Sequence, residues 1–144
     1  MSKPVTRSIE IGAPVSRVIE VISDLENTDR WANEAKSAEV TEHDAQGRPA
    51  KIDVTLGAVG FTTTSTYAVA YTDDSVTLTF VAGKLIKEST IAYTARDLGD
   101  GRTHLDMSST MEVTVKGVPR WGLERAMGSS AEKNLQSIKK DAEG

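Results

Sequence analysis

The residues of this chain most suited to chemistry are its two histidines, because imidazole can bind a metal ion or move a proton near neutral pH. His104 and Asp106 lie two positions apart in a segment with strand-like alternation, so both side chains point to one face. An imidazole and a carboxylate on one face could bind a metal, but the sequence offers no third ligand beside them. His43 stands alone near an expected loop. We therefore interpret His104 and Asp106 as solvated surface residues and predict no metal site.

Other familiar chemical motifs are absent from the 144 residues. There is no cysteine, which excludes disulfides, thiol nucleophiles and thiolate metal sites. The sequence also lacks the H-E-x-x-H, G-x-S-x-G, phosphate-loop and G-x-G-x-x-G patterns, so zincin, hydrolase and nucleotide-binding classes have no support. The carboxylates of the expected strands fall on the outer face and do not converge as a glycosidase pair would. We predict no cofactor and assign no catalytic residue.

A second group of polar residues occupies positions that strand and helix periodicity directs inward. These hydroxyl, amide and cationic side chains interrupt faces that are otherwise apolar. They are Ser65, Tyr67, Ser89, Tyr93, Ser109, Arg120, Ser130 and Asn134, with Lys87 near a strand end. Such groups can polarise a carbonyl during aldol cyclisation or dehydration of a poly-β-ketone. They can also satisfy one another or orient a passive ligand, which is the alternative that we favour.

The longest element that positions these residues is an amphipathic helix expected from Val118 to Lys140. At 100° per residue, one side collects Arg120, Leu123, Met127, Ser130, Ala131, Asn134 and Ile138, with Leu135 at its margin. The opposite side is charged or polar and collects Arg125, Ser129, Glu132, Lys133, Gln136 and Lys140. The first side needs covering, yet its polar members would need partners in a dry core. It therefore fits either the wall of a cavity or an ordinary core helix with polar edges.

The N-terminal part of the chain predicts one strand followed by two short helices. Val5 to Ile11 alternates apolar and polar residues, which is typical of a half-buried strand. Pro14 suits the first position of a helix over Val15 to Ser23. Asp24 can cap a second short helix over Leu25 to Trp31, because its carboxylate can accept hydrogen bonds from the first amides of that turn.

From Ala35 onward, β-rich segments alternate with turn residues. The expected strands are Ser37 to His43, Ala50 to Leu56, Phe61 to Tyr71, Val76 to Ala82, Leu85 to Ala95 and Thr103 to Val115. Their short connections favour antiparallel neighbours, and Asp100-Gly101 is the strongest hairpin signal. A meander of this length twists and curls, and the hollow of a curled sheet must be covered. The C-terminal helix is the element long enough to cover it.

Length and charge limit the classes of function further. We expect a single domain over residues 1–144, since a chain of this size can bury one core without disulfides. The formal net charge of −4 argues against a nucleic-acid partner, which would need a basic surface. No stretch resembles a signal peptide or an integral membrane segment, so we expect a cytoplasmic protein, as a monomer or weak homodimer.

The order of these elements, from one strand and two short helices through six antiparallel strands to a long helix, is that of the helix-grip fold. The run Ile9-Glu10-Ile11-Gly12-Ala13-Pro14, leading into Val15 to Ser23 and then Asp24-Leu25 and Trp31, resembles the opening of START-like (SRPBCC) proteins. The small polyketide cyclase/dehydrase-like group is the most similar, and the closing helix after Gly117-Val118-Pro119 is similar to theirs too. The resemblance spans nearly the whole chain and implies an α+β fold, with a curved seven-stranded antiparallel sheet around the last helix. It also implies a hollow for hydrophobic molecules such as lipids, polyketides or isoprenoids.

Family members include enzymes and carriers, so the fold does not settle the function. Our hypothesis is that the chain binds or transports a hydrophobic small molecule between the sheet and the last helix, and the alternative is a polyketide cyclase or dehydratase using the same hollow. The residues expected to line that hollow come from both walls and from its entrance. They are Trp31, Tyr67, Phe80, Ile91, Tyr93, Met107, Ser109, Met111, Arg120, Leu123, Met127, Ser130 and Asn134.

Overall fold

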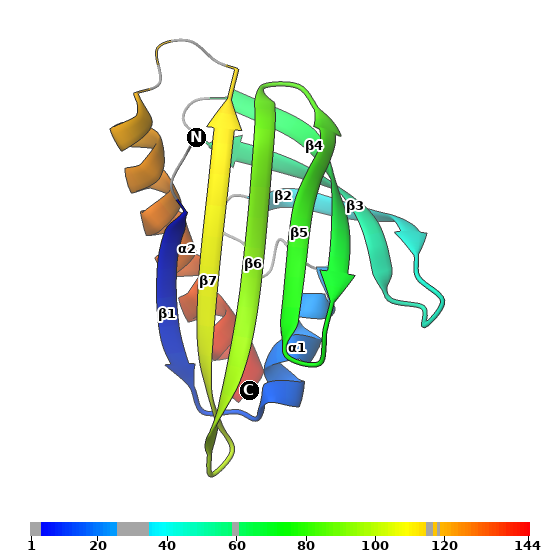
Figure 1. Ribbon diagram of the computed structural model, residues 1–144, viewed down its shortest axis with the longest axis vertical. Helices are drawn as coiled ribbons and strands as arrows, with labels where there is room; N and C mark the ends of the chain where they lie inside the picture. The colour runs from blue at the N-terminus through cyan, green and yellow to red at the C-terminus, as the bar shows by residue number, and fades with distance from the viewer. Residues whose placement is uncertain (1–3, 26–34, 59–60, 115–116, 118) are drawn as a thin grey trace.

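The computed structural model describes residues 4–25, 35–58, 61–114, 117 and 119–144. Its helices and strands follow the order β1 (Val5–Ile11), α1 (Val15–Ser23), β2 (Ala35–His43), β3 (Pro49–Ala58), β4 (Phe61–Tyr71), β5 (Ser75–Gly83), β6 (Ile86–Gly99), β7 (Arg102–Val113) and α2 (Arg120–Glu143). The strands form one antiparallel sheet in the order β1-β7-β6-β5-β4-β3-β2 (Figure 1). The seven-stranded sheet and the long C-terminal helix that the sequence predicted are confirmed. Of the second short helix, only Leu25 lies within the described residues.

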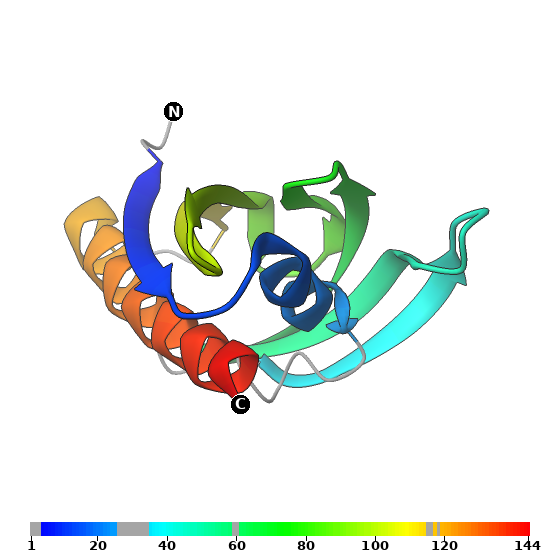
Figure 2. The same ribbon diagram turned by 90° about the horizontal axis from the view of Figure 1, so that it is seen from below.

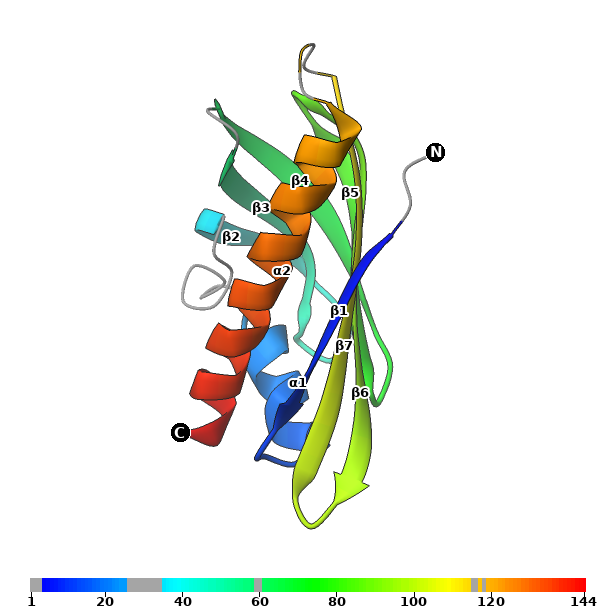
Figure 3. The same ribbon diagram turned by 90° about the vertical axis from the view of Figure 1, so that its left-hand side faces the viewer.

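The sheet is strongly curved, and both helices lie on its concave side. Figure 2 shows the strands in an arc from β1 to β2, with α1 and α2 inside the arc. Figure 3 shows α2 running along the length of β1 and β7. The closest packing of α2 is against β1, followed by α1 and β7. The helix therefore covers one side of the concave face more closely than the other.

The hairpin between β6 and β7 forms at the dipeptide that the sequence marked. Asp100 and Gly101 have φ angles of 56° and 72°, so both have the positive φ that a type I′ turn requires. An aspartate tolerates this region better than most side chains do, and glycine has no Cβ to clash there. Gly99 pairs with Arg102 across the turn. The prediction for this turn is confirmed.

A β-bulge at the start of β6 reverses the facing that alternation predicted there. Ile86 pairs with Val113 and Glu88 pairs with Glu112, which leaves Lys87 as the extra residue. As a result, Ile86 is buried while Lys87 is exposed. Lys87, which strand parity directed inward near the strand end, therefore faces solvent, because one inserted residue exchanges the two faces of a strand.

A second irregularity lies between β4 and β5 but leaves the predicted facing of Phe80 in place. Thr66 pairs with Ala82 while Tyr67 pairs with Phe80, so Val81 is the extra residue and is 51% exposed. The rings of Tyr67 and Phe80 meet edge to face, with centroids 6.1 Å apart and an interplanar angle of 77°. Phe80 therefore packs on the same side of the sheet as Tyr67.

The first strand carries an arginine that contacts the long helix. Arg7 shares the parity of Val5, Ile9 and Ile11. It pairs with Met107 within the sheet and reaches α2, where its Nε lies 3.4 Å from a carboxylate oxygen of Glu132. A Cβ on Gly128 would lie 2.5 Å from the Arg7 guanidinium. Gly128 therefore makes room for this side chain.

The short helix and the end of the long helix are joined to the sheet by hydrogen bonds. Thr103 Oγ1 donates to the carbonyl of Ala13 at 2.7 Å inside the core, just before α1. Pro14 has an extended conformation and lies just before the first residue of α1, whereas the sequence predicted it at the first helical position. Arg17 then donates to the carbonyl of Asp141 near the end of α2 at 3.1 Å. These bonds fix α1 and the last turn of α2 at the same end of the sheet.

Glu143 connects the last turn of α2 to the loop after β1. Its carboxylate accepts hydrogen bonds from Lys139 Nζ and from the backbone N–H of Gly12, each at 2.6 Å. Lys139 also donates to the carbonyl of Glu10 at 3.1 Å. The bond from Lys139, followed by that from Gly12, holds the pKa of Glu143 below its ordinary value of 4.5.

We expect Glu143→Gln to lower the melting temperature near neutral pH but not in acid. A lowered folded-state pKa means that the stabilisation is present above the ordinary pKa of 4.5 and is lost as the pH falls through the lowered value. Thermal unfolding of both proteins at about pH 6 and about pH 3 checks this. A difference in melting temperature that stays the same at both pH values would contradict the role of the ionised carboxylate.

Candidate ligand-binding site

The concave face of the sheet forms one wall of the candidate site. Cross-strand pairing places Tyr93 between Val76 and Met107, and Ser109 between Ile91 and Val5. Tyr67, Tyr93 and Met107 are 1%, 2% and 4% exposed. This wall thus carries large apolar surfaces with hydroxyl groups among them.

The inner side of α2 forms the opposite wall. Its buried residues are Met127, Gly128, Ser130, Ala131, Asn134, Leu135, Ile138 and Ala142. All six residues predicted for the solvent side of the helix, from Arg125 to Lys140, are exposed. The buried stripe drawn from the sequence is therefore present from Met127 onward, whereas Arg120 is exposed and Leu123 is partly exposed. The helix begins at Arg120 and extends to Glu143.

Hydroxyl groups on the two walls differ in whether the protein supplies their partners. Tyr67 Oη donates to Ser89 Oγ at 3.1 Å, and both side chains are 1% exposed. Thr63 Oγ1 donates to the carbonyl of Lys84 at 2.7 Å. By contrast, the buried hydroxyl oxygens of Ser65 and Ser130 have no hydrogen-bond partner. An ordinary core would pair or omit such groups.

The residues predicted to line the hollow fall into three groups in the structure. Those buried are Tyr67, Tyr93, Met107, Ser109, Met127, Ser130 and Asn134. Those partly exposed are Phe80, Ile91, Met111 and Leu123. Arg120 is exposed at the first residue of α2, and Trp31 lies outside the described residues. Trp121, the second residue of α2, is 69% exposed.

The interior contains no charged side chain among the residues whose burial the structure describes. None of the aspartate, glutamate, lysine, arginine and histidine side chains in that part of the chain is buried.

His104 Nε2 and Asp106 Oδ1 lie 3.0 Å apart on the outer face, so they pair with each other. In the ranges that the structure covers, no three histidine, cysteine or acidic residues gather as metal ligands would. Within those same ranges, neither helix has the length and apolarity needed to cross a membrane.

A separate cluster at the β2–β3 end was not anticipated. The Arg48 guanidinium carbon lies 4.4 Å from the centre of the Tyr71 ring, and Tyr71 Oη donates to the carbonyl of Pro49 at 2.6 Å. Burial raises the pKa of Tyr71 to about 12. The backbone N–H of Arg48 is the main cause that lowers the pKa of Asp44. These contacts stabilise the hairpin, and no sequence motif marks those of Tyr71 because they join residues far apart along the chain.

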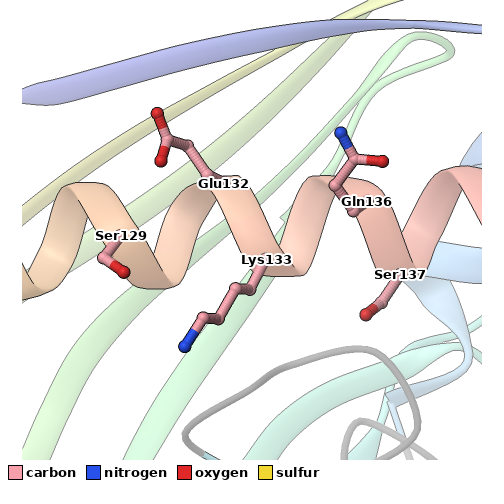
Figure 4. Close-up of a pocket in the computed structure, with 5 residues that line it drawn as sticks. All are labelled: Ser129, Glu132, Lys133, Gln136 and Ser137. Carbon is pink, nitrogen blue, oxygen red and sulfur yellow. The ribbon is translucent and has the colours of Figure 1, made fainter.

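Two depressions on the outside of α2 are distinct from the interior. One is lined by Ser129, Glu132, Lys133, Gln136 and Ser137. Figure 4 shows Glu132 and Gln136 on one side of the helix, with Lys133 and Ser137 on the other. The second lies between β1 and α2, where Arg7 and Glu132 meet. Both are lined mainly by polar side chains.

The curved antiparallel sheet with its long C-terminal helix matches the START-like, helix-grip fold. Residues 3–143 match the family model described as "Polyketide cyclase / dehydrase and lipid transport", and the chain belongs to this family. No curated protein matches the chain significantly.

Solved structures with the same fold cover nearly the whole chain. A START superfamily protein from Mycobacterium smegmatis has 20% identity and a TM-score of 0.87, with 97% of each chain covered. The Zhui aromatase/cyclase from Streptomyces sp. R1128 has 15% identity and a TM-score of 0.84, covering 98% of this chain and 93% of that one. A protein from Thermus thermophilus has 19% identity and a TM-score of 0.84, with 97% of each chain covered. These similarities establish the fold.

Proposed function

We propose that the protein binds or transports a hydrophobic small molecule, of lipid, polyketide or isoprenoid type, between the concave face of the sheet and α2. The observation that carries this proposal is the unpaired state of Ser65 and Ser130, one on each wall of an interior that is otherwise apolar. A core built for packing alone gains nothing from hydroxyls that lack partners. A ligand with an apolar body and a few polar atoms would bury its surface there and supply those partners.

The family supports the same reading, because its description includes lipid transport. Three methionines add to it. Met107 and Met127 are buried and Met111 is partly buried, on the walls that would contact the ligand. Their flexible thioethers can repack around molecules of different shape. We further propose that the protein acts as a monomer or weak homodimer in the cytoplasm.

Native mass spectrometry of gently purified protein is the direct test. We expect a second mass series that exceeds the protein mass by one small molecule and that loses it on collisional activation. Extraction with organic solvent would then identify the molecule's class. Recovery of the bare protein mass alone, together with failure of apolar dyes and aromatic probes to bind, would contradict the proposal.

A cyclase or dehydratase activity in the same interior is the second candidate, favoured by the buried hydrogen bond between Tyr67 and Ser89. Because Tyr67 donates its hydroxyl hydrogen to Ser89, the serine keeps its own hydrogen, which it can donate to a substrate carbonyl to stabilise the negative charge that develops during aldol closure. The similarity to the Zhui aromatase/cyclase is consistent with such chemistry. The two functions differ in what the hydroxyl does, which is to orient a ligand or to act on it.

If the protein is a cyclase, we expect Tyr67→Phe to lower turnover of a poly-β-ketone about 10- to 1000-fold while leaving substrate affinity nearly unchanged, the pattern of lost transition-state stabilisation. Single-turnover product analysis and a separate binding titration measure the two effects. Tyr71→Phe is the matched control, because Tyr71 donates to the Pro49 carbonyl in the β2–β3 cluster. If the wild type shows no turnover and Tyr67→Phe only weakens binding, the carrier function is favoured.

A further inference from the structure

The two unpaired hydroxyls point to the chemistry of the ligand as well as to its presence. Ser65 lies in β4 and Ser130 lies in α2, and their side chains are 1% and 6% exposed. Both oxygens are shielded from solvent, and the protein supplies neither with a partner. Each has one donor hydrogen and two acceptor lone pairs available. A bound molecule that satisfies them must therefore carry hydrogen-bonding atoms.

The other polar groups of the interior are neutral as well. The buried polar residues in the described ranges are Thr63, Ser65, Ser89, Thr103, Ser109, Ser130 and Asn134. Ser89 already accepts from Tyr67, and Thr63 and Thr103 already donate to backbone carbonyls. Among these buried residues, the hydroxyl oxygens that are completely shielded from solvent and have no hydrogen-bond partner are those of Ser65 and Ser130.

The described residues bury no charged side chain, which limits the charge that a ligand can carry. An ionised carboxylate or ammonium group carried inside would lose its hydration and meet no ion of opposite sign. A ketone, an alcohol or a phenol loses much less on entering, and a serine hydroxyl can replace its bond to water. The interior therefore selects by charge as well as by polarity.

We infer that the ligand is an uncharged, oxygen-bearing hydrophobe, such as a ketone, alcohol or phenol, whose oxygen atoms bond to Ser65 and Ser130, and that ionised fatty acids are rejected. This inference rests on the proposed function, because it describes the occupant of the same interior. According to this inference, Ser65 and Ser130 determine which ligands bind and do not determine how the protein folds.

Three probes that share one carbon skeleton test it: naphthalene, 2-naphthol and 2-naphthoate, titrated by calorimetry or fluorescence at neutral pH. Naphthol is uncharged under these conditions and naphthoate is ionised. We expect 2-naphthol to bind about 3- to 10-fold more tightly than naphthalene, the range of one net hydrogen bond. Naphthoate is expected to bind at least about 10-fold more weakly than naphthol.

Ser65→Ala and Ser130→Ala are expected to reduce the preference for naphthol over naphthalene while leaving naphthalene affinity unchanged. Neither is expected to lower the melting temperature, because each removes a buried hydroxyl that has no partner. Ser129→Ala is the matched control, since the adjacent Ser129 is exposed on the outer side of α2.

The outcomes separate this inference from the proposed function. If naphthalene and naphthol bind equally, if naphthoate binds as well as naphthol, or if both serine variants keep the full preference, the inference is overturned while ligand binding stands. The last of these results would mean that the hydroxyls meet only internal water. If none of the three probes binds, the proposed function itself is contradicted.

Discussion

Replacing Ile138 by alanine is expected to lower the free energy of unfolding by about 2–5 kcal/mol, the range for truncating a fully buried aliphatic side chain. Ile138 is 0% exposed and lies on the inner side of α2, within the core cluster that α1 and the sheet also form. The loss combines the transfer of the removed carbons to water with the cavity left behind. Urea denaturation of the wild type and the variant measures it.

The control for this prediction is Gln136→Ala, two residues earlier on the exposed side of the same helix. It is expected to change stability by no more than about 0.5 kcal/mol, since its side chain contacts mainly solvent. A loss below about 1 kcal/mol for Ile138→Ala would show that α2 is not held in the core as the structure has it.

The regular parts of the fold could be predicted because local signals agree with tertiary packing there. The bounds expected for one strand, Phe61–Tyr71, are those of β4. Turn residues marked its two ends, and alternation marked its buried side. The Asp100-Gly101 turn was equally clear, because few other residues adopt positive φ readily. Where propensity, pattern and turn chemistry coincide, the sequence is sufficient.

The departures arise where one residue is inserted or where distant elements meet. A bulged residue such as Lys87 leaves no signature in the alternation, because the pattern on either side of it remains regular. The contact of Arg7 with Gly128 depends on how closely α2 lies beside β1. Likewise, the stacking of Arg48 on Tyr71 depends on the pairing of β3 with β4, which brings the β2–β3 hairpin beside Tyr71. None of these distances follows from local sequence.

For the candidate site, too, the sequence predicted some features and missed others. Periodicity correctly directed Tyr67, Tyr93 and Met127 inward, since all three are buried. It did not distinguish serines that the protein pairs, such as Ser89, from those it leaves unpaired, such as Ser130. That distinction depends on the spacing between the walls, which sheet curvature sets and composition does not reveal. The sequence therefore indicated which of these residues are buried, but it did not indicate which of their hydroxyls lack partners.

Met127→Trp is expected to weaken binding of 2-naphthol at least about 10-fold with only a small change in stability. Met127 faces the interior from α2 and is 9% exposed, so a larger, rigid indole in its place would occupy space that the proposed ligand needs. If that space is available for a ligand, the indole enters it at a cost below about 1 kcal/mol. If side chains already fill it, overpacking costs about 1–3 kcal/mol.

Ser129→Trp supplies the matched control, because it adds the same indole to the exposed side of the helix two residues away. It is expected to leave both the affinity for 2-naphthol and the urea midpoint nearly unchanged. Titration and denaturation of the two variants in parallel separate occlusion from damage to the fold. Unaltered binding by a stably folded Met127→Trp protein would place the ligand elsewhere, because an indole at this position cannot share the interior with a second aromatic ring of similar size.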